Sequence, residues 1–159
     1  MKYSSIVTPA EVIALAFSDG GYVAPENIGE VDIATAVGRW VKPVVGEALL
    51  EAAALSRYKE LREEYLKPAA ALYTRLLVQP RLNAVTSQLG LTVGAGASSK
   101  VAEASLREEH LRAIKTRAHA ALRALSEYLN DHAEEIKEYN PKENVLNRCS
   151  CDGGFVQIF

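Results

Sequence analysis

The sequence predicts a mainly α-helical protein, an elongated helical bundle with two long amphipathic helices, short N-terminal helices and an extended C-terminal tail. Apolar residues recur every three or four positions through most of the 159 residues, which is the spacing of a helix face. Capping residues, glycines and prolines separate these runs in the way that helix ends require. Helices formed by the two longest runs would also be longer than the diameter of a compact domain of this size.

The first helix is expected to begin at Pro9. Thr8 is suited to the N-cap, Pro9 to the first helical position, and Glu11 stands three residues after the cap. This arrangement is a capping box, in which threonine and glutamate satisfy backbone N–H groups reciprocally. The glycine-containing segment Asp19–Gly21 is expected to stop the helix.

Two short helices are expected next. Ile33, Val37, Trp40 and Val41 fall at helical spacing, and Trp40 is expected in the core. Pro43 should break or bend this run, because its ring clashes with the preceding turn. A second short helix is expected over residues 46–54.

The first long helix is expected between residues 56 and 90. Its apolar stripe consists of Tyr58, Leu61, Tyr65, Ala69, Leu72 and Leu76. Because the stripe continues in phase past Pro68, that proline should kink the helix rather than end it. Pro80 is expected to kink the helix or to end it, and Gly90 closes the segment.

Residues 90–99 are rich in small side chains and predict a flexible connector before a second long helix over residues 99–136. Its nearly heptad seam consists of Leu111, Ile114, Ala118, Leu122, Leu125 and Leu129. A helix of about 36 residues is about 54 Å long, so either the long helices are broken or the molecule is elongated. An elongated body would bury its surplus apolar surface against other copies.

Two regions are expected, a helical domain over residues 1–140 and an extended tail over residues 141–159, since Pro141 bars a further helix. The tail holds two β-prone apolar patches separated by a Gly-Gly turn. Its end carries four large apolar residues, too many to leave in water, which either fold back or dock on a neighbour and are our candidate interface: Phe155, Val156, Ile158 and Phe159. Cys149 and Cys151 are interpreted as incidental small residues in a reduced setting, because a bridge across one residue would be strained.

No motif for catalysis, cofactor binding or metal binding is found, so we expect a protein that is not an enzyme and has no cofactor. Gly94 and Gly96 lack the third glycine of a dinucleotide-binding loop. His110, His119 and His132 lack the glutamate three residues earlier that a di-iron bundle needs, and are expected on solvated faces. No run of 18 apolar residues and no signal peptide is recognised, so no membrane association is expected.

Charge is distributed in blocks: −4 over residues 1–55, +6 over residues 56–125 and −4 over residues 126–159. The basic middle could contact a polyanion, attract the acidic parts of neighbouring copies, or only solvate helix faces. Arg112, Lys115 and Arg117 are the candidate polyanion contacts. For these residues we favour ion pairs with glutamates on the same or adjoining helices.

The order of parts resembles the small helical head–tail connector (adaptor) proteins of tailed bacteriophages and prophages. The matching pieces are the short opening helix, the helical pair "EVDIATAVGRWVKPVVGEALLEAA", the helix "YLKPAAALYTRLL", the small-residue connector and the long helix ending "ALRALSEYLNDHAEEIKEYN". They cover about residues 5–140, and the tail with its two cysteines departs from the pattern.

The resemblance implies a virion structural protein whose subunits assemble into a ring below the portal. Its partners would be further copies of itself, the portal and tail-completion proteins, with possible non-specific DNA contact in a channel. It would be found in the virion, or in the host bacterial cytoplasm during assembly. The alternative is a DNA-packaging or DNA-binding helical protein of the small-terminase kind, and an enzyme with an unrecognised bundle site is a third hypothesis.

Overall fold

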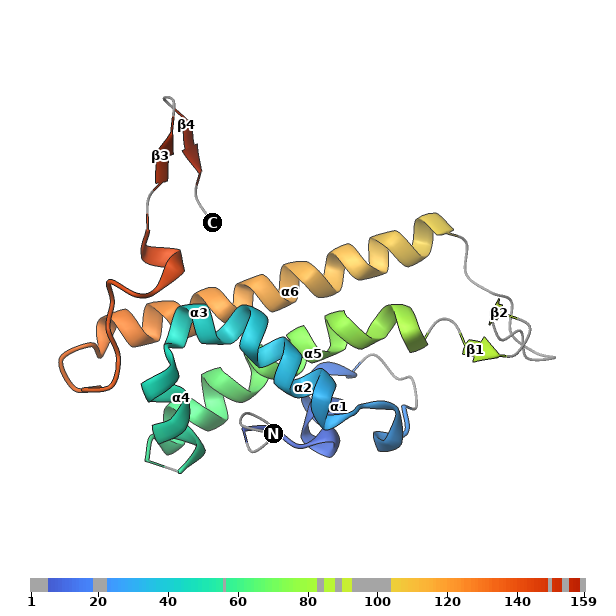
Figure 1. The fold of residues 1–159 in the computed structure, drawn as a ribbon, viewed down its shortest axis with the longest axis horizontal. Helices are drawn as coiled ribbons and strands as arrows, with labels where there is room; N and C mark the ends of the chain where they lie inside the picture. The colour runs from blue at the N-terminus through green and yellow to red at the C-terminus, as the bar shows by residue number, and fades with distance from the viewer. Residues whose placement is uncertain are drawn as a thin grey trace.

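The computed structural model describes residues 6–18, 23–55, 57–82, 85–87, 90–92, 104–148, 150–152 and 155–157. It shows an elongated helical bundle, as the sequence predicts (Figure 1). Two long helical segments run side by side, and shorter N-terminal helices cover one flank of the first of them.

Helix α1 (Pro9–Ala16) begins where the sequence predicts. The Thr8 hydroxyl accepts from the Glu11 N–H at 3.3 Å, and the Glu11 carboxylate accepts from the Thr8 N–H at 2.8 Å. The capping box is therefore confirmed. The predicted stop at residues 19–21 lies outside the described residues, and the short 3-10 helix η1 (Pro25–Asn27) follows.

The next helix continues through Pro43. It consists of α2 (Glu30–Ala36), the π-helical turn η2 (Val37–Val41) and α3 (Lys42–Val45). The Lys42 N–H donates to the carbonyl of Val37, five residues earlier, and this wider turn relieves the clash that a proline ring otherwise makes. The interruption expected at Pro43 lies instead at Gly46, whose φ of +85° turns the chain into α4 (Glu47–Ala54).

The same device precedes Pro68. The π-helical η3 (Leu61–Leu66) leads directly into α5 (Lys67–Leu82), and the Lys67 N–H donates to the carbonyl of Arg62. The prediction that the helix continues past Pro68 is confirmed. Pro80 lies inside α5, two residues before its end.

Helix α6 (Ala104–Asp131) is the second long helix and packs along α5. Five of the six residues of its predicted seam are buried, namely Ile114, Ala118, Leu122, Leu125 and Leu129, and Leu111 is partly exposed. The helix ends at Asp131 and not at residue 136 as predicted, and turns follow. Acidic side chains in that stretch oppose the helix dipole, which accounts for the earlier end.

Two antiparallel hairpins complete the described chain. Strand β1 (Val85–Ser87) pairs with β2 (Gly90–Thr92). Neither strand was predicted, since residues 85–87 belong to the segment expected to close at Gly90 and residues 90–92 to the expected connector. Strand β3 (Ser150–Asp152) pairs with β4 (Phe155–Gln157), as expected of two β-prone patches around a glycine turn. Both hairpins stand away from the helices (Figure 1).

Helix α5 packs against the other helices on several sides. Buried polar side chains on α5 determine how the neighbouring helices are positioned against it. The ammonium of Lys67, 7% exposed, lies 2.7 Å from the Glu11 carboxylate and 2.6 Å from that of Glu63. The guanidinium of Arg75, 2% exposed, donates to the carbonyl of Ala16 at 2.5 Å. Burial of a cation requires such acceptors, so these contacts position α1 against α5.

The first part of the tail is fastened to α6 by a buried polar network. The side chain of Asn144, fully buried, donates to the hydroxyls of Ser126 and Tyr139 at 2.8 Å, and accepts from the Leu146 N–H at 2.9 Å. The 3-10 helix η4 (Val145–Asn147) follows directly. Residues 141–148 therefore pack on the helical body, and the projecting part of the tail begins after them.

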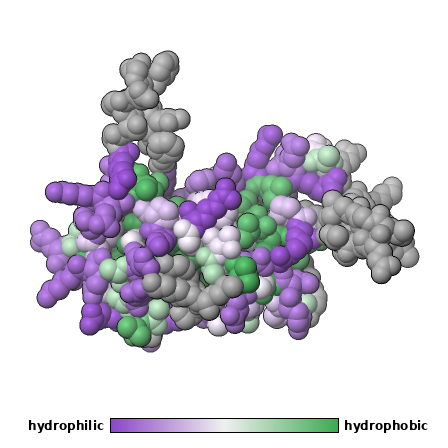
Figure 2. All heavy atoms as spheres, viewed as in Figure 1, coloured by the Kyte–Doolittle hydropathy of each residue, from purple (hydrophilic) through white to green (hydrophobic). Residues whose placement is uncertain are grey.

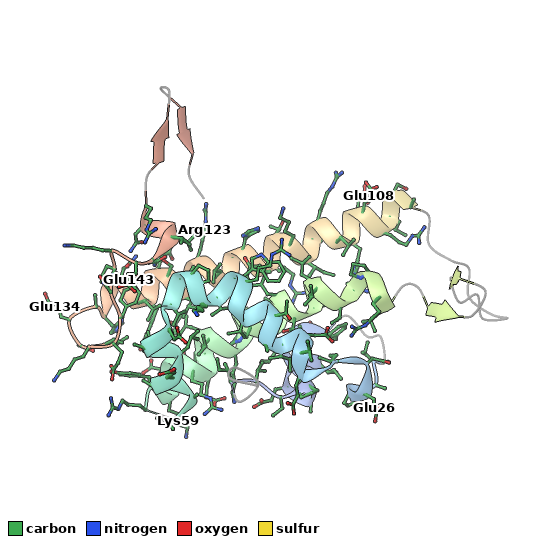
Figure 3. All side chains as sticks on the ribbon, in the orientation of Figure 1. Glu26, Lys59, Glu108, Arg123, Glu134 and Glu143 are labelled. Carbon is green, nitrogen blue, oxygen red and sulfur yellow. The ribbon has the colours of Figure 1, made fainter. Side chains whose placement is uncertain are left out.

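Charged side chains lie around the outside of this body. Glu26, Lys59, Glu108 and Glu134 mark its periphery in Figure 3.

Two glycines with equal space but different backbones give a test of this fold. A methyl group at either Gly46 or Gly38 meets no atom within 4 Å, but only Gly46 has a positive φ. Gly46→Ala should therefore lower the free energy of unfolding by about 1–2 kcal/mol. Gly38→Ala, in a helical turn, should raise it by about 0.5–1 kcal/mol. Urea denaturation measures both, and an equal effect of the two substitutions would contradict the turn at Gly46.

The contact between α1 and α5 should be sensitive to acid. The hydrogen bond from Lys67, followed by that from the Thr8 backbone, lowers the pKa of Glu11 from 4.5 to about 2. A carboxyl with a lowered folded-state pKa stabilises the fold above its unfolded pKa, and this contribution is lost as the pH falls. Between pH 4.5 and pH 2 the free energy of unfolding of Glu11→Gln should decrease less steeply than that of the wild type. The matched control is the exposed Glu26→Gln, which should follow the wild-type curve.

Candidate functional site

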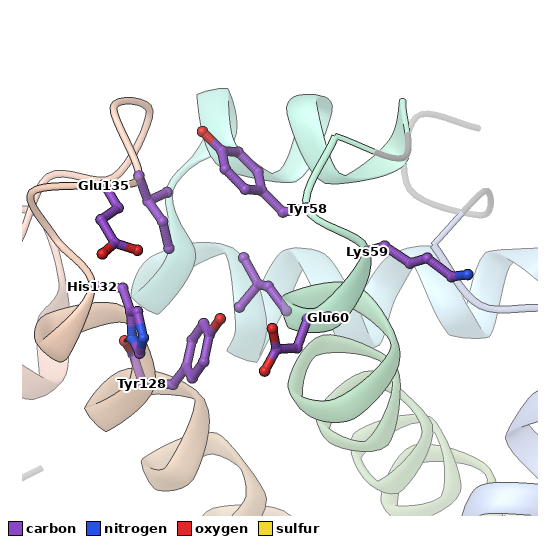
Figure 4. Close-up of a pocket in the computed structure, with 8 residues that line it drawn as sticks. Tyr58, Lys59, Glu60, Tyr128, His132 and Glu135 are labelled. Carbon is purple, nitrogen blue, oxygen red and sulfur yellow. Dashed lines mark hydrogen bonds between the residues drawn. The ribbon is translucent and has the colours of Figure 1, made fainter.

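A pocket of about 230 Å³ lies where η3 meets the end of α6 (Figure 4). We call it the acidic pocket, and it is lined by Tyr58, Lys59, Glu60, Leu61, Tyr128, His132, Glu135 and Ile136. Leu61 and Ile136 are buried and supply its apolar part. Glu60 and Glu135 are exposed and lie on opposite sides of Tyr128, whereas the Lys59 side chain points away (Figure 4).

Three stacked rings make one wall rigid. Tyr128 stacks on Tyr65 with ring centroids 4.4 Å apart and on His132 with centroids 4.2 Å apart. The Nδ1 atom of His132 lies 2.9 Å from the carbonyl oxygen of Tyr128, so Nδ1 carries a proton. In the neutral ring, Nε2 is then the acceptor.

The electrostatic potential in the pocket is negative. The pKa of Tyr128 is raised by burial and then by the charges of Glu60, Tyr65, Glu135 and Glu64. Neither Glu60 nor Glu135 has a hydrogen-bond or salt-bridge partner for its carboxylate within the described residues. The pocket therefore combines two uncompensated carboxylates with an apolar floor, an environment that favours a cationic ligand.

The edge of the pocket is fixed by Glu138. Its carboxylate accepts from the Tyr58 hydroxyl and from Nη1 of Arg57, each at 2.5 Å. The hydrogen bond to Glu138 raises the pKa of Tyr58, and the same bond lowers the pKa of Glu138. These contacts hold the start of η3 against the turns that follow α6.

Arg112, Lys115 and Arg117 are all exposed on α6. Arg112 and Lys115 project from one side of the helix and Arg117, two residues further on, from the other. We call the three together the basic face. Figure 2 shows hydrophilic side chains along the outer edge of this helix. Arg112 lies 3.6 Å from Glu108, and both side chains are more than two-thirds exposed, so this pair contributes little stability. Lys115 and Arg117 form no salt bridge within the described residues, so the predicted ion pairing is wrong for these two.

The two histidines on α6, His110 and His119, are exposed as predicted, but each contacts a buried residue. His132, which follows α6, is half-buried. His119 Nδ1 lies 3.1 Å from the Tyr73 hydroxyl, and His110 Nε2 lies 3.1 Å from Nη2 of Arg75. Burial raises the pKa of Tyr73 to about 12, so its hydroxyl remains the donor. Burial, and then the charges of Lys115 and Arg123, lower the pKa of His119 and favour the neutral acceptor.

The candidate interface at the C-terminus is described only in its backbone. Phe155 and Val156 lie in β4, with Phe155 opposite Asp152 and Val156 opposite Cys151. Ile158, Phe159 and Cys149 lie outside the described residues. No group of three or more histidine, cysteine, aspartate or glutamate side chains within the described ranges could hold a metal ion. None of the helices described is both long enough and apolar enough to span a membrane.

Sequence reasoning missed the acidic pocket. A signal was present, since Tyr128 and His132 are four residues apart on one helical face and Tyr58 and Tyr65 are seven apart. Their convergence depends on the packing of η3 against α6, which the spacing alone does not determine.

A protein-family model, the family of unknown function DUF6712, matches residues 41–148. The chain belongs to this family. Neither the curated proteins nor the solved structures contain a match. The acidic pocket and the basic face both lie inside the DUF6712 segment, and the segment ends at Arg148, immediately after the part of the tail that Asn144 fastens to α6. The hairpin of β3 and β4 lies beyond it.

Proposed function

We propose that this DUF6712 protein is a virion structural protein, a head–tail connector subunit that assembles into a ring below the portal of a tailed bacteriophage or prophage. Its partners are further copies of the chain, the portal and tail-completion proteins. It acts in the virion, or in the host bacterial cytoplasm during assembly. The order of helical parts resembles that of such connectors, and the helices lie at the positions that carry the resemblance.

The observation that supports this proposal most is the pair of projecting hairpins. Each is a sheet of two strands, so the outer edge of every strand is unpaired within the described residues. A two-stranded hairpin is marginally stable in water, and an open strand edge pairs readily with another chain. Two such elements on one small body are suited to contacts with neighbouring subunits and with the portal.

The attachment of the second hairpin also favours this function. The buried Asn144 fixes residues 141–148 on α6, so β3 starts from a rigid base. A segment that docks on a partner binds with less loss of entropy when its base is already ordered.

Removal of residues 149–159 tests the role of this hairpin. The shortened chain should keep its helical circular dichroism and its thermal midpoint, because the Asn144 network is intact. It should no longer form rings with the portal protein of the same genome, as seen by negative-stain electron microscopy. A chain with those eleven residues replaced by a glycine-serine segment is the matched control for length and should behave like the deletion.

Two results would count against these ideas. If the shortened chain forms rings as the full chain does, the hairpin is not the contact. If the full chain never associates with the portal, and its gene does not neighbour portal, terminase and capsid genes, the connector function is wrong.

The DNA-packaging or DNA-binding alternative is supported by the exposure of the basic face. Each phosphate contact releases a condensed counterion, so affinity for duplex DNA should decrease as salt rises. Replacing Arg112, Lys115 and Arg117 by alanine should then reduce the salt slope by about three. The matched control removes Lys59, Lys137 and Lys142, three exposed lysines near the acidic end of the molecule. Fluorescence anisotropy of labelled duplex DNA measures the affinity. Absence of binding at 50 mM salt would exclude this alternative.

A further inference from the structure

We propose that the acidic pocket of one subunit receives a basic side chain from the basic face of a second copy, so that subunits join head to tail. This inference rests on the proposed ring assembly, for which it names the contact. The carboxylates of Glu60 and Glu135 in the acidic pocket, and Lys115 and Arg117 in the basic face, form no salt bridge within the described residues.

The chemistry of the acidic pocket suits the side chain of arginine or lysine. The carboxylates of Glu60 and Glu135 stand on opposite sides, and Nε2 of His132 adds an acceptor. Leu61 and Ile136, 2% and 4% exposed, offer an apolar surface for a methylene stem. A cationic head on an apolar stem matches this arrangement. The volume of about 230 Å³ is below the range of about 300–1,000 Å³ for sites that bind whole small molecules, and suits a single side chain.

The charges along α6 and the segment after it explain why the ligand is a second copy. Residues 104–123 carry five basic and two acidic side chains, a formal charge of +3. Residues 124–143 carry two basic and six acidic side chains, a formal charge of −4. The 28 residues of α6 span about 42 Å, so the basic half lies at one end and the acidic pocket at the other.

This arrangement determines the geometry of the contact. In the proposed assembly each pair of copies meets through one basic face and one acidic pocket, so the contact is heterologous, and such contacts generate rings when the rotation closes. An antiparallel pair, in which each basic face meets the other copy's pocket, is isologous and stops at the dimer, so association beyond the dimer distinguishes the two arrangements. Two copies that lie parallel and in register place like charges together and repel one another. Duplex DNA is also excluded from the acidic pocket by repulsion between phosphates and carboxylates.

The test uses two full-length variants. The pocket variant carries Glu60→Gln and Glu135→Gln, and the face variant carries Arg112→Gln, Lys115→Gln and Arg117→Gln. All five residues are exposed, so both variants should keep the wild-type circular dichroism and thermal midpoint. The matched control carries Glu26→Gln and Glu30→Gln, which remove the same charge at exposed sites outside the pocket and outside residues 124–143. Sedimentation equilibrium at low salt gives the association constants.

Wild type and control should associate beyond the dimer, and less strongly as salt rises. Each variant alone should associate at least 10-fold more weakly. An equimolar mixture of the two should give a dimer and nothing larger, because only one competent pocket and one competent face can meet.

Three results would overturn the proposal: wild-type protein that stays monomeric at every concentration, a pocket variant that associates like the wild type, or a mixture that recovers no dimer. The connector function fails separately, when full-length protein does not bind the portal. Rings on the portal that are unchanged by the pocket variant leave that function in place and remove only the contact proposed here.

Discussion

The fold depends on the burial of cationic side chains in a helix that is surrounded by its neighbours. Lys67 and Arg75 lie in the interior on α5, where an uncompensated charge costs several kcal/mol. Each has an acceptor on α1, namely the carboxylate of Glu11 for Lys67 and the carbonyl of Ala16 for Arg75. The same helix stacks Tyr73 on Trp40 and offers its hydroxyl to His119 on α6. The polar side chains of α5 therefore find their partners only when α1 and α6 are in place. Because α6 carries the basic face and one side of the acidic pocket, these contacts also position both surfaces.

Much of this fold could be predicted, because local rules govern it. The capping box at Thr8 determines where α1 begins, and the seam from Ile114 to Leu129 determines which side of α6 is buried. The continuation past Pro68 could be predicted because the apolar stripe stays in phase, but the continuation through Pro43 and the widened turns before both prolines could not. Each proline follows a turn closed by a bond to the fifth preceding residue, and that widening depends on packing as well as on the proline. The hairpin of β1 and β2 was missed because residues 85–87 lie in the segment expected to close at Gly90, and residues 90–92 lie in the connector rich in small side chains.

The candidate sites show a similar division. Exposure of Arg112, Lys115 and Arg117 follows from their positions outside the buried seam of α6. The absence of ion pairs at Lys115 and Arg117 within the described residues does not follow from the sequence. The acidic pocket joins residues about 70 positions apart, and no local pattern places Tyr58 beside Tyr128. The buried asparagine network likewise depends on a return of the chain after Tyr139, which the sequence shows only as a proline-terminated helix.

The widened turn in η3 also determines how the residues before it are rotated about the helix axis relative to the residues after it. One additional residue in a helical turn rotates everything before it by about 100° relative to everything after it. Tyr58 and Glu60 precede this turn and Lys67 follows it, so the turn sets the angle between the pocket wall and the buried cation. Loss of a single residue here would swing the pocket wall away from the end of α6 while leaving composition and hydropathy nearly unchanged. In this chain the length of the segment therefore determines where the pocket wall lies, whichever side chains the segment carries.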